Sequence, residues 1–273
     1  MEKLTLNNGI SIPAIGLGVF RVEEAKTAQE AVEMALSVGY RHIDTAMIYG
    51  NEEAVGLAIK NSGIYREDIF VTTKLWNDDQ RSGKVDEAID ASLKRLGLDY
   101  IDLYLVHWPV KTTYVNVWKK MEKVYTEGKT RAIGVSNYHV HHLEDLLKEA
   151  EYVPAVNQFE CYPYLTQEPL MKYCKEKGII PEAWGPLGAG KTDILNNSVI
   201  KAIADKYGKT PAQIVLRWHL DRGFIVIPKS VHKERQIENF SISDFHLTDE
   251  EIKKISGLNQ DKRLGSNPDN FNF

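Results

Sequence analysis

The sequence has few cysteines. Its two thiols, Cys161 and Cys174, belong to no Cys-x-x-Cys pair and to no pattern of zinc-ligand spacing. A disulfide framework and a cysteine-ligated zinc site are therefore both excluded as organising elements. So few cysteines suit a reducing compartment, and we expect a cytoplasmic protein.

The sequence also lacks long apolar runs and an excess of positive charge. No run approaches 18 apolar residues, and no basic region followed by an apolar core opens the chain, so we expect neither a membrane span nor a signal peptide. Lys and Arg total 34 against 38 Asp and Glu, a net charge of −4. This balance argues against a nucleic-acid-binding or membrane-binding surface, so an anionic ligand would need a local cluster of cations.

The remaining composition is that of an ordinary globular protein. The chain has 273 residues, of which 43% are hydrophobic and 26% are charged. This length suits one α/β barrel. No linker, repeat or low-complexity run divides the chain, so we expect a single domain over residues 1–273.

Extended apolar runs and helical patterns alternate along the chain. The runs lie at residues 41–45, 69–75, 100–107, 131–136, 155–160, 179–184, 224–228 and 242–245. Helical patterns lie at residues 23–38, 52–61, 85–96, 115–127, 140–149, 167–177, 198–207, 212–221 and 248–258. Strands that alternate with crossover helices form a parallel sheet, and eight of them close as a (β/α)8 TIM barrel. A doubly wound open sheet is the alternative.

Local signals sharpen parts of this pattern. Residues 4–12 alternate around Asn8-Gly9, which predicts a β-hairpin. We expect this hairpin to cap the bottom of the barrel. Thr210-Pro211 and the pair Thr248 and Glu251 predict helix starts.

Polar residues follow the expected strands at their carboxyl ends, where the working residues of such barrels lie. Four of them, with different chemistry, should converge on one rim: Asp44, Tyr49, Lys74 and His107. Each alone has an ordinary explanation, as a turn cap, a solvated strand end or a satisfied histidine. Only the four residues together therefore indicate a functional site.

These four side chains suit the reduction of a carbonyl group. A tyrosine can donate a proton to a carbonyl oxygen, and the Lys74 ammonium would lower its ordinary pKa of about 10. Asp44 would hold Lys74 in place and protonated, and His107 would hydrogen-bond to the same oxygen and orient it. Because no side chain supplies a hydride, this chemistry requires a cofactor.

The sequence resembles a known family. Four segments look like signatures of the aldo-keto reductases: Gly-Tyr-Arg-His-Ile-Asp-Thr-Ala at 39–46, Ile-Asp-Leu-Tyr-Leu-Val-His-Trp-Pro at 101–109, Ile-Gly-Val-Ser-Asn at 133–137 and Ile-Pro-Lys-Ser at 227–230. Within this family, the chain is similar to the bacterial branch with glyoxal/methylglyoxal reductases and 2,5-diketo-D-gluconate reductases. The resemblance implies that Asp44, Tyr49, Lys74 and His107 are the catalytic tetrad, with Tyr49 as the general acid. It also implies a protein that is commonly monomeric.

The resemblance implies a set of cofactor contacts as well. They are Ser136, Asn137 and Gln158 at the nicotinamide carboxamide, Trp184 on the nicotinamide ring, Gly185 and Leu187 in the following loop, Lys229, Ser230 and Arg235 at the 2′-phosphate, and Glu238 and Asn239 at the adenine. On physical grounds, two cations and a hydroxyl close together suit a phosphate in an otherwise acidic protein. This favours NADPH over NADH. The alternative is a solvated, charged helix start.

The sequence departs from the family pattern beside the cofactor and in the pocket. Gly185 stands where the family often has Ser, Phe20 where it often has Trp, and Tyr162 where it often has His. The expected pocket walls are Phe20, Trp76 and Trp108, together with His107. A tail of about fifteen residues after the last helix suggests an open, shallow pocket for small aldehydes and dicarbonyls.

Two further motifs point to other functions. Residues 185–192 match the Walker A pattern of ATPases, but a P-loop needs its Lys and Thr in the first turn of a helix, and the helical pattern begins only near Ser198. A glycine-rich loop with Lys191 could equally cover a dinucleotide pyrophosphate. His139, His141 and His142 form a cluster, but no carboxylate or cysteine joins them at ligand spacing and two of them should point to different helix faces. We therefore expect no metal site.

The second class of function left open is a cofactor-binding barrel without turnover. The complete tetrad favours an enzyme, and turnover of NADPH with methylglyoxal would distinguish the two.

Overall fold

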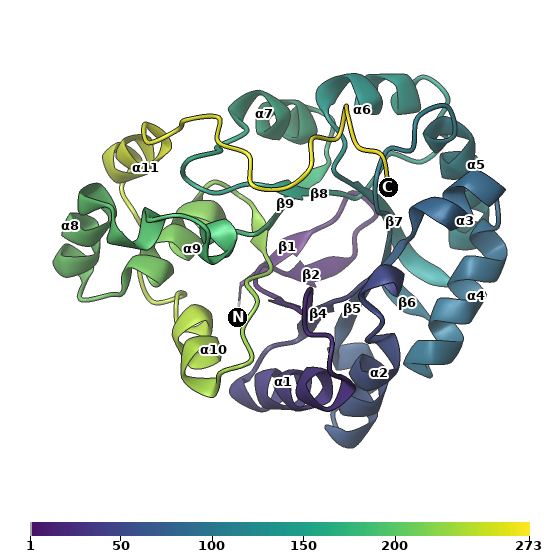
Figure 1. Ribbon diagram of the computed structural model, residues 1–273, viewed down its shortest axis with the longest axis horizontal. Coiled ribbons are helices and arrows are strands. Elements are labelled where there is room, and N and C mark those ends of the chain that lie inside the picture. Colours follow the sequence, from purple (N-terminus) through teal and green to yellow (C-terminus); the bar gives the residue numbers. More distant parts are fainter. Residues whose placement is uncertain (1) are drawn as a thin grey trace.

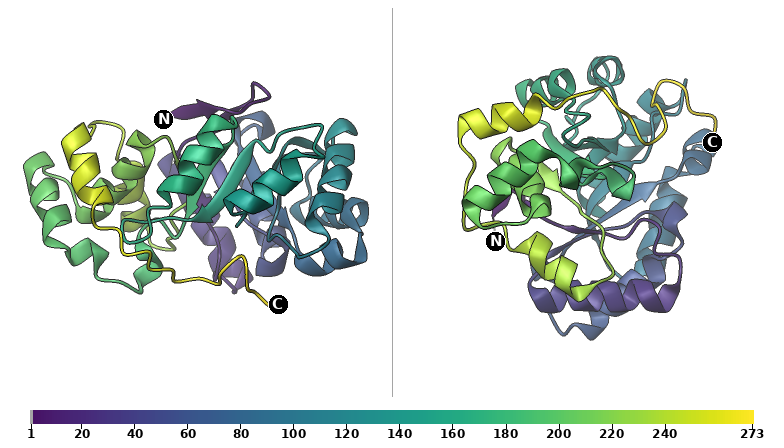
Figure 2. Two further views of the ribbon diagram at one scale, coloured as in Figure 1. Left: turned by 90° about the horizontal axis from the view of Figure 1, so that it is seen from above. Right: turned by 60° about the vertical axis from the view of Figure 1, so that its left-hand side comes forward.

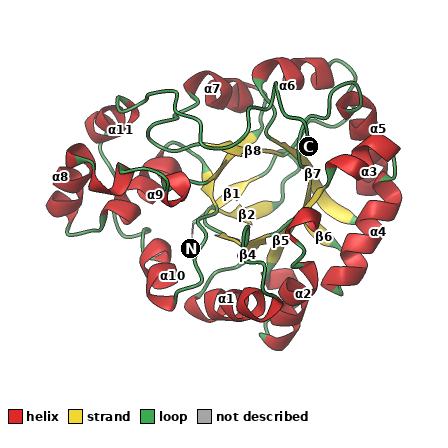
Figure 3. Cartoon of the chain, viewed as in Figure 1, coloured by secondary structure: helices red, strands yellow, loops and turns green. Residues whose placement is uncertain are grey.

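The computed structural model describes residues 2–273, and its centre is a barrel of parallel strands ringed by helices (Figure 1; Figure 3). The strands are β3 (Leu17–Gly18), β4 (His42–Asp44), β5 (Phe70–Leu75), β6 (Ile101–Val106), β7 (Thr130–Ser136), β8 (Val156–Glu160), β9 (Ile180–Trp184) and β10 (Ile225–Val226). Each strand pairs in parallel with the next one in the chain.

The barrel closes between its first and last strands. The backbone N–H of Gly16 donates to Val226 O at 2.9 Å, and that of Gly18 donates to Pro228 O at 3.2 Å. A side chain at Gly18 would disturb this seam, because its Cβ would lie 2.9 Å from Ile227 O. The (β/α)8 barrel is therefore confirmed, and the open sheet is not found.

The prediction of a strand is wrong for one of the eight apolar runs. Residues 242–245 are irregular chain between α10 (Lys233–Phe240) and α11 (Asp249–Ser256). Their apolar side chains have other uses, since Ile242 is buried in the core and Phe245 packs on Tyr207 with ring centroids 5.3 Å apart. The eighth strand is β3, whose two residues are too few to show a pattern.

Helices cover the outside of the barrel (Figure 1). Besides α10 and α11, the α-helices are α1 (Ala25–Val38), α2 (Glu52–Asn61), α3 (Asn77–Ser82), α4 (Val85–Leu96), α5 (Tyr114–Thr126), α6 (Val140–Leu147), α7 (Glu168–Glu176), α8 (Ser198–Tyr207) and α9 (Pro211–Asp221). The helix starts predicted at Thr210 and Thr248 are confirmed, each with a capping box. The short helix α3 was not predicted, and α10 was foreseen only as the helix start in the alternative to the phosphate site.

The two ends of the barrel differ. The hairpin of β1 (Lys3–Thr5) and β2 (Ser11–Pro13) covers the amino ends of the strands, where Ile12 packs among buried side chains that include Phe70 and Leu103. The tail after α11 crosses the opposite end (Figure 2). The carboxyl ends of the strands therefore face the tail. Among the described helices, none is long and apolar enough to cross a bilayer.

Candidate active site

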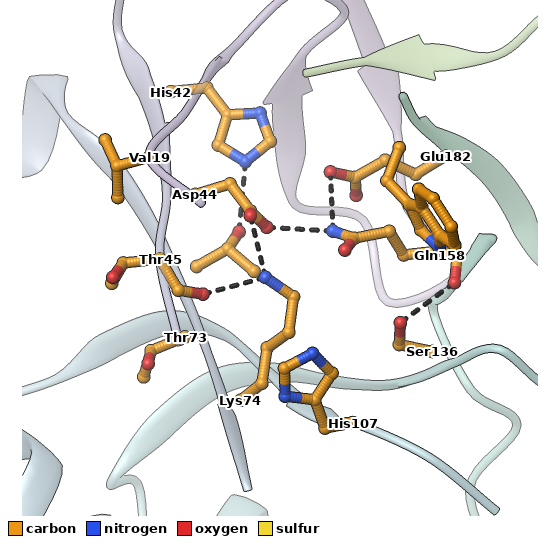
Figure 4. Close-up of polar contacts among 12 residues, drawn as sticks. Val19, His42, Asp44, Thr45, Thr73, Lys74, His107, Ser136, Gln158 and Glu182 are labelled. Carbon is orange, nitrogen blue, oxygen red and sulfur yellow. Dashed lines mark hydrogen bonds and ion pairs between the residues drawn. The ribbon is translucent and has the colours of Figure 1, made fainter. Parts of the chain in front are cut away.

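A buried ion pair lies inside the barrel near the carboxyl ends of β4 and β5 (Figure 4). The Lys74 ammonium donates to Asp44 Oδ1 at 2.7 Å and to Thr45 O at 2.7 Å. The side chains of Lys74 and Asp44 are 0% and 2% exposed. The Gln158 amide donates to the second oxygen of Asp44 at 2.8 Å. Each charge therefore has specific partners in place of water.

The ion pair keeps Lys74 charged in spite of its burial. Burial alone would lower the pKa of Lys74, but the Asp44 carboxylate and Tyr49 raise this pKa above its ordinary value. Burial raises the pKa of Asp44, and the Lys74 charge and the two hydrogen bonds oppose that rise. The ammonium is therefore a fixed positive charge beneath the rim of the barrel.

Asn51 and Glu52, which follow Tyr49-Gly50 in the sequence, hold Tyr49 on the rim of the barrel. It ends the short 3-10 turn η1 (Met47–Tyr49), and the side chain of Asn51 ties this loop to the barrel. Asn51 Oδ1 accepts from Thr45 Oγ1 at 2.7 Å, and its Nδ2 donates to Val19 O at 3.0 Å. All groups in these contacts are buried, so the hydrogen bonds fix the position of the loop against the barrel.

Glu52 completes this anchor at the start of α2. Its carboxylate accepts from Thr73 Oγ1 at 2.6 Å and from Arg95 Nε at 2.7 Å, which joins α2 to β5 and α4. Sequence reasoning missed Asn51 and Glu52. The available signal was an amide and a carboxylate directly after Tyr49-Gly50, where a helix starts.

The Tyr49 ring lies against the other predicted catalytic groups. Lys74 Nζ is 5.1 Å from its centroid, and the His107 ring is edge-on at 5.9 Å. The Lys74 charge lowers the pKa of Tyr49, as predicted, but the net shift of this pKa is upward. Burial raises this pKa by more than the Lys74 charge lowers it. Tyr49 is therefore a neutral phenol, which can donate a proton.

His107 is neutral as well. It directly follows β6, and its backbone N–H donates to Leu75 O at 3.2 Å. Burial, and then the charge of Lys74, hold its pKa well below the ordinary value. A neutral imidazole beside the phenol can hydrogen-bond to a substrate oxygen without adding charge. The four residues predicted as a tetrad are thus brought together.

Sequence reasoning missed a second buried carboxyl group, Glu182 on β9. The Gln158 amide bridges the two carboxyl groups, since its Nε2 donates to Asp44 and also to Glu182 Oε1 at 3.1 Å. Burial, and then the negative charge of Asp44, raise the pKa of Glu182 to about 8. Glu182 is therefore mostly protonated at neutral pH. The available signal was a lone Glu between Pro181 and Ala183 in an apolar strand.

The residues predicted to contact the nicotinamide lie together on the rim of the barrel, beside the tetrad. Ser136 Oγ donates to Gln158 O at 2.9 Å, and Trp184 Nε1 donates to Asn137 Oδ1 at 2.9 Å. Asn137 has a left-handed backbone, with φ 64°, and its Nδ2 donates to His107 O at 3.0 Å. Their polar groups therefore bond to one another and to the tetrad, so a carboxamide bound here would share these donors and acceptors.

The loop after Trp184 is not a P-loop. Gly185, Gly188 and Gly190 all have positive φ, and Leu187 packs against the core. Lys191 follows a 3-10 turn, and α8 begins only at Ser198. The Walker A alternative fails for the reason given by the sequence, because Lys191 and Thr192 are not in the first turn of a helix.

The predicted phosphate site lies at the amino end of α10. Lys229 and Arg235 are exposed, and neither takes part in the ion pairs found among residues 2–273. Ser230 Oγ accepts from the backbone N–H of His232 at 3.1 Å. Glu238 and Asn239 lie one turn further along α10, and Asn239 is buried. Two unpaired cations and a helix amino terminus fit an anionic group.

The tail packs against two of the residues predicted to form the pocket walls. Phe20 is 53% exposed and lies 4.9 Å from the Tyr49 ring, while Trp76 lies 5.2 Å from His107. Phe273 stacks on Trp76 at 5.9 Å and meets Trp108 edge-on at 5.2 Å. The Phe273 carbonyl also accepts from Arg81 at 2.6 Å. The mouth is therefore more covered than the short tail suggested.

The raised pKa of Glu182 makes a testable contribution to stability. Its ordinary pKa is 4.5, against about 8 in the folded protein, so between these values the folded state keeps a proton that the unfolded chain has lost. This residue therefore lowers the free energy of unfolding as pH rises, by at most ~1.4 kcal/mol per pH unit. In thermal unfolding, the Tm of wild type should therefore fall relative to the Tm of Glu182→Gln as the pH rises from 5 to 8.

The exposed Glu53→Gln on α2 is the control, and its Tm should follow wild type across this range. A Tm difference between Glu182→Gln and wild type that does not change with pH would contradict the assignment.

Comparison with known proteins agrees with this geometry. The model of the Aldo/keto reductase family matches residues 14–260. Glyoxal reductase of Bacillus subtilis (strain 168) is 52% identical over 272 residues, which cover 100% of this chain and 98% of that protein. Methylglyoxal reductase of Escherichia coli (strain K12) is 48% identical over 270 residues, 98% of this chain and 97% of its own.

A solved structure extends the likeness to three dimensions. The aldo-keto reductase of Bombyx mori, in complex with NADP, superposes with a TM-score of 0.93 at 38% identity, covering 98% of this chain and 96% of that one. The matches in sequence and in structure run over nearly the whole chain. The protein described here belongs to the aldo/keto reductase family of oxidoreductases.

Proposed function

We propose that this protein is an NADPH-dependent reductase of small aldehydes and dicarbonyl compounds, such as methylglyoxal. The observation that carries the proposal is the neutral phenol of Tyr49 beside a fixed ammonium, Lys74, at the aromatic mouth of the barrel. A general acid in this place suits a reaction in which a carbonyl oxygen gains a proton.

In this proposal each side chain has a separate task. Tyr49 donates its proton to the carbonyl oxygen. The Lys74 ammonium stabilises the phenolate that remains, and Asp44 holds this ammonium in place through the 2.7 Å ion pair. His107, neutral, hydrogen-bonds to the same oxygen and orients the carbonyl. Each group is already in its working protonation state before substrate arrives.

The residues present fit the proposed cofactor. NADPH, when bound, supplies the hydride. Lys229, Ser230 and Arg235 would hold the 2′-phosphate at the amino terminus of α10, where exposed backbone N–H groups favour an anion. Trp184, Asn137 and their neighbours would hold the nicotinamide. The exposed, unpaired state of both cations supports NADPH over NADH.

The pocket and the relatives support small, compact substrates. The mouth is lined by Phe20, Trp76 and Trp108 and partly covered by Phe273. Aromatic walls suit planar carbonyl compounds with few polar substituents. Relatives that match nearly the whole chain are named glyoxal reductase and methylglyoxal reductase.

The first experiment replaces Tyr49 by Phe, which removes the proton donor and keeps the ring. With methylglyoxal and NADPH, we expect kcat to fall by about 10²–10⁴. The Kd for NADPH, measured by fluorescence quenching, should stay close to wild type. The 76% exposed Tyr65, replaced by Phe, is the matched control with unchanged kcat. Near-normal turnover by Tyr49→Phe would show that another group donates the proton.

The second experiment replaces Arg235 by Ala and compares two cofactors. Only NADPH carries the 2′-phosphate, and a hydrogen bond to a charged group contributes about 1.5–3 kcal/mol, or roughly a 10- to 100-fold change in affinity. We expect the Kd for NADPH to rise by that factor and the Kd for NADH to stay nearly the same. Lys254→Ala, an exposed cation on α11, should change neither. Equal losses for both cofactors would place the phosphate elsewhere.

A further inference from the structure

The amino-terminal turn of α6 and the tail meet in a cluster of three histidines and one carboxylate, here called the His/Asp cluster. The sequence showed His139, His141 and His142 without a carboxylate at ligand spacing. The structure corrects this, since Asp269 reaches the cluster from 130 positions along the chain. The two histidines expected on different faces also come together, with the rings of His141 and His142 4.0 Å apart.

The distances within the cluster are short. Asp269 Oδ2 lies 2.9 Å from His139 Nδ1, while Asp269 Oδ1 lies 3.2 Å from His141 Nε2 and 3.7 Å from His142 Nε2. One potential ligand atom from each residue lies within 4.8 Å of all the others. In a tetrahedral site with metal–ligand bonds of ~2.0–2.1 Å, ligand atoms are about 3.3 Å apart. Small side-chain rotations would bring this cluster to that geometry.

We propose that the His/Asp cluster binds one divalent transition-metal ion, best matched by Zn²⁺, and that this ion fastens the tail to α6. Imidazole nitrogen and carboxylate oxygen are preferred ligands of Zn²⁺, whereas Mg²⁺ and Ca²⁺ prefer oxygen alone. The site is separate from the catalytic tetrad, and nothing in the proposed reaction uses it.

The hydrogen bonds of the cluster assign different tasks to the histidines. His142 Nδ1 accepts from the backbone N–H of His139 at 3.1 Å, as part of the helix cap, so the proton of a neutral His142 is on Nε2. His142 Nε2 lies 3.7 Å from Asp269 Oδ1, too far for a hydrogen bond, and a small rotation would let its N–H orient the carboxylate as a second-shell group does. His139 Nδ1, His141 Nε2 and Asp269 are the three direct ligands, and water completes the site.

Binding would also change the contact between His139 and Arg263. Arg263 lies 3.4 Å from His139 Nε2, which must carry the proton once Nδ1 holds the metal. This long contact would open, and Arg263 would keep its ion pair with Glu160 at 3.7 Å. The positive charge of Arg263 lowers the affinity, so we expect a reversible site.

The position of Asp269 links the metal to the mouth of the barrel. Phe271 and Phe273, two and four residues later, pack on Trp108 with ring centroids 5.1 and 5.2 Å apart. An ion that holds Asp269 against α6 would restrict the tail immediately before these rings. Zn²⁺ should therefore slow the release of the tail.

The test titrates chelator-treated, full-length protein with Zn²⁺ alone in an isothermal calorimeter. We expect one equivalent to bind wild type, and His141→Ala and Asp269→Ala each to weaken binding by tenfold or more. His141 and Asp269 side chains are 57% and 44% exposed, so both variants should fold, which circular dichroism checks. His246→Ala removes another exposed histidine paired with an aspartate, Asp221, and should leave the Kd unchanged. Equal Kd values in all four proteins would overturn the site.

Carboxypeptidase digestion tests the tether separately, because its readout is independent of carbonyl reduction. We expect Zn²⁺ to slow release of the residues from Phe273 inward by severalfold in wild type and not in Asp269→Ala. Zinc binding without this protection would contradict the fastening of the tail.

Discussion

The arrangement of the site depends on the ion pair between Lys74 and Asp44 inside the barrel. Two charges without water are costly, and a buried pair is often no more stabilising than apolar side chains of similar size. Its presence in a core that is otherwise mostly apolar is therefore better explained by chemistry than by stability. The pair places one fixed positive charge under Tyr49 and His107, whose pKa values keep both groups neutral.

The barrel and the tetrad could be predicted because both follow from local patterns. Parallel strands bring their carboxyl ends to one face, so residues that end successive strands must meet. The features that were missed depend on distant contacts. Strand β3 has two residues and is defined by its pairing with β4 and by the seam with the last strand. Asp269 belongs to the His/Asp cluster only because the tail folds back across the barrel.

The sign of the Tyr49 pKa shift was also out of reach of the sequence. Lys74 was correctly placed beside the phenol, and its charge does lower the pKa. The extent of burial decides the net result, and burial depends on Phe20, on the loop held by Asn51 and on the rest of the rim. A pattern of residue types shows which groups meet, but it does not show how much water they keep.

The most direct test removes both charges of the central pair in one variant, Asp44→Asn with Lys74→Met. Because neither charge is left unpaired, the protein should stay folded with a Tm near that of wild type. The rate of carbonyl reduction in a single turnover, with NADPH already bound, should fall by about 10²–10⁴. A folded double variant that reduces methylglyoxal at the wild-type rate would contradict the account.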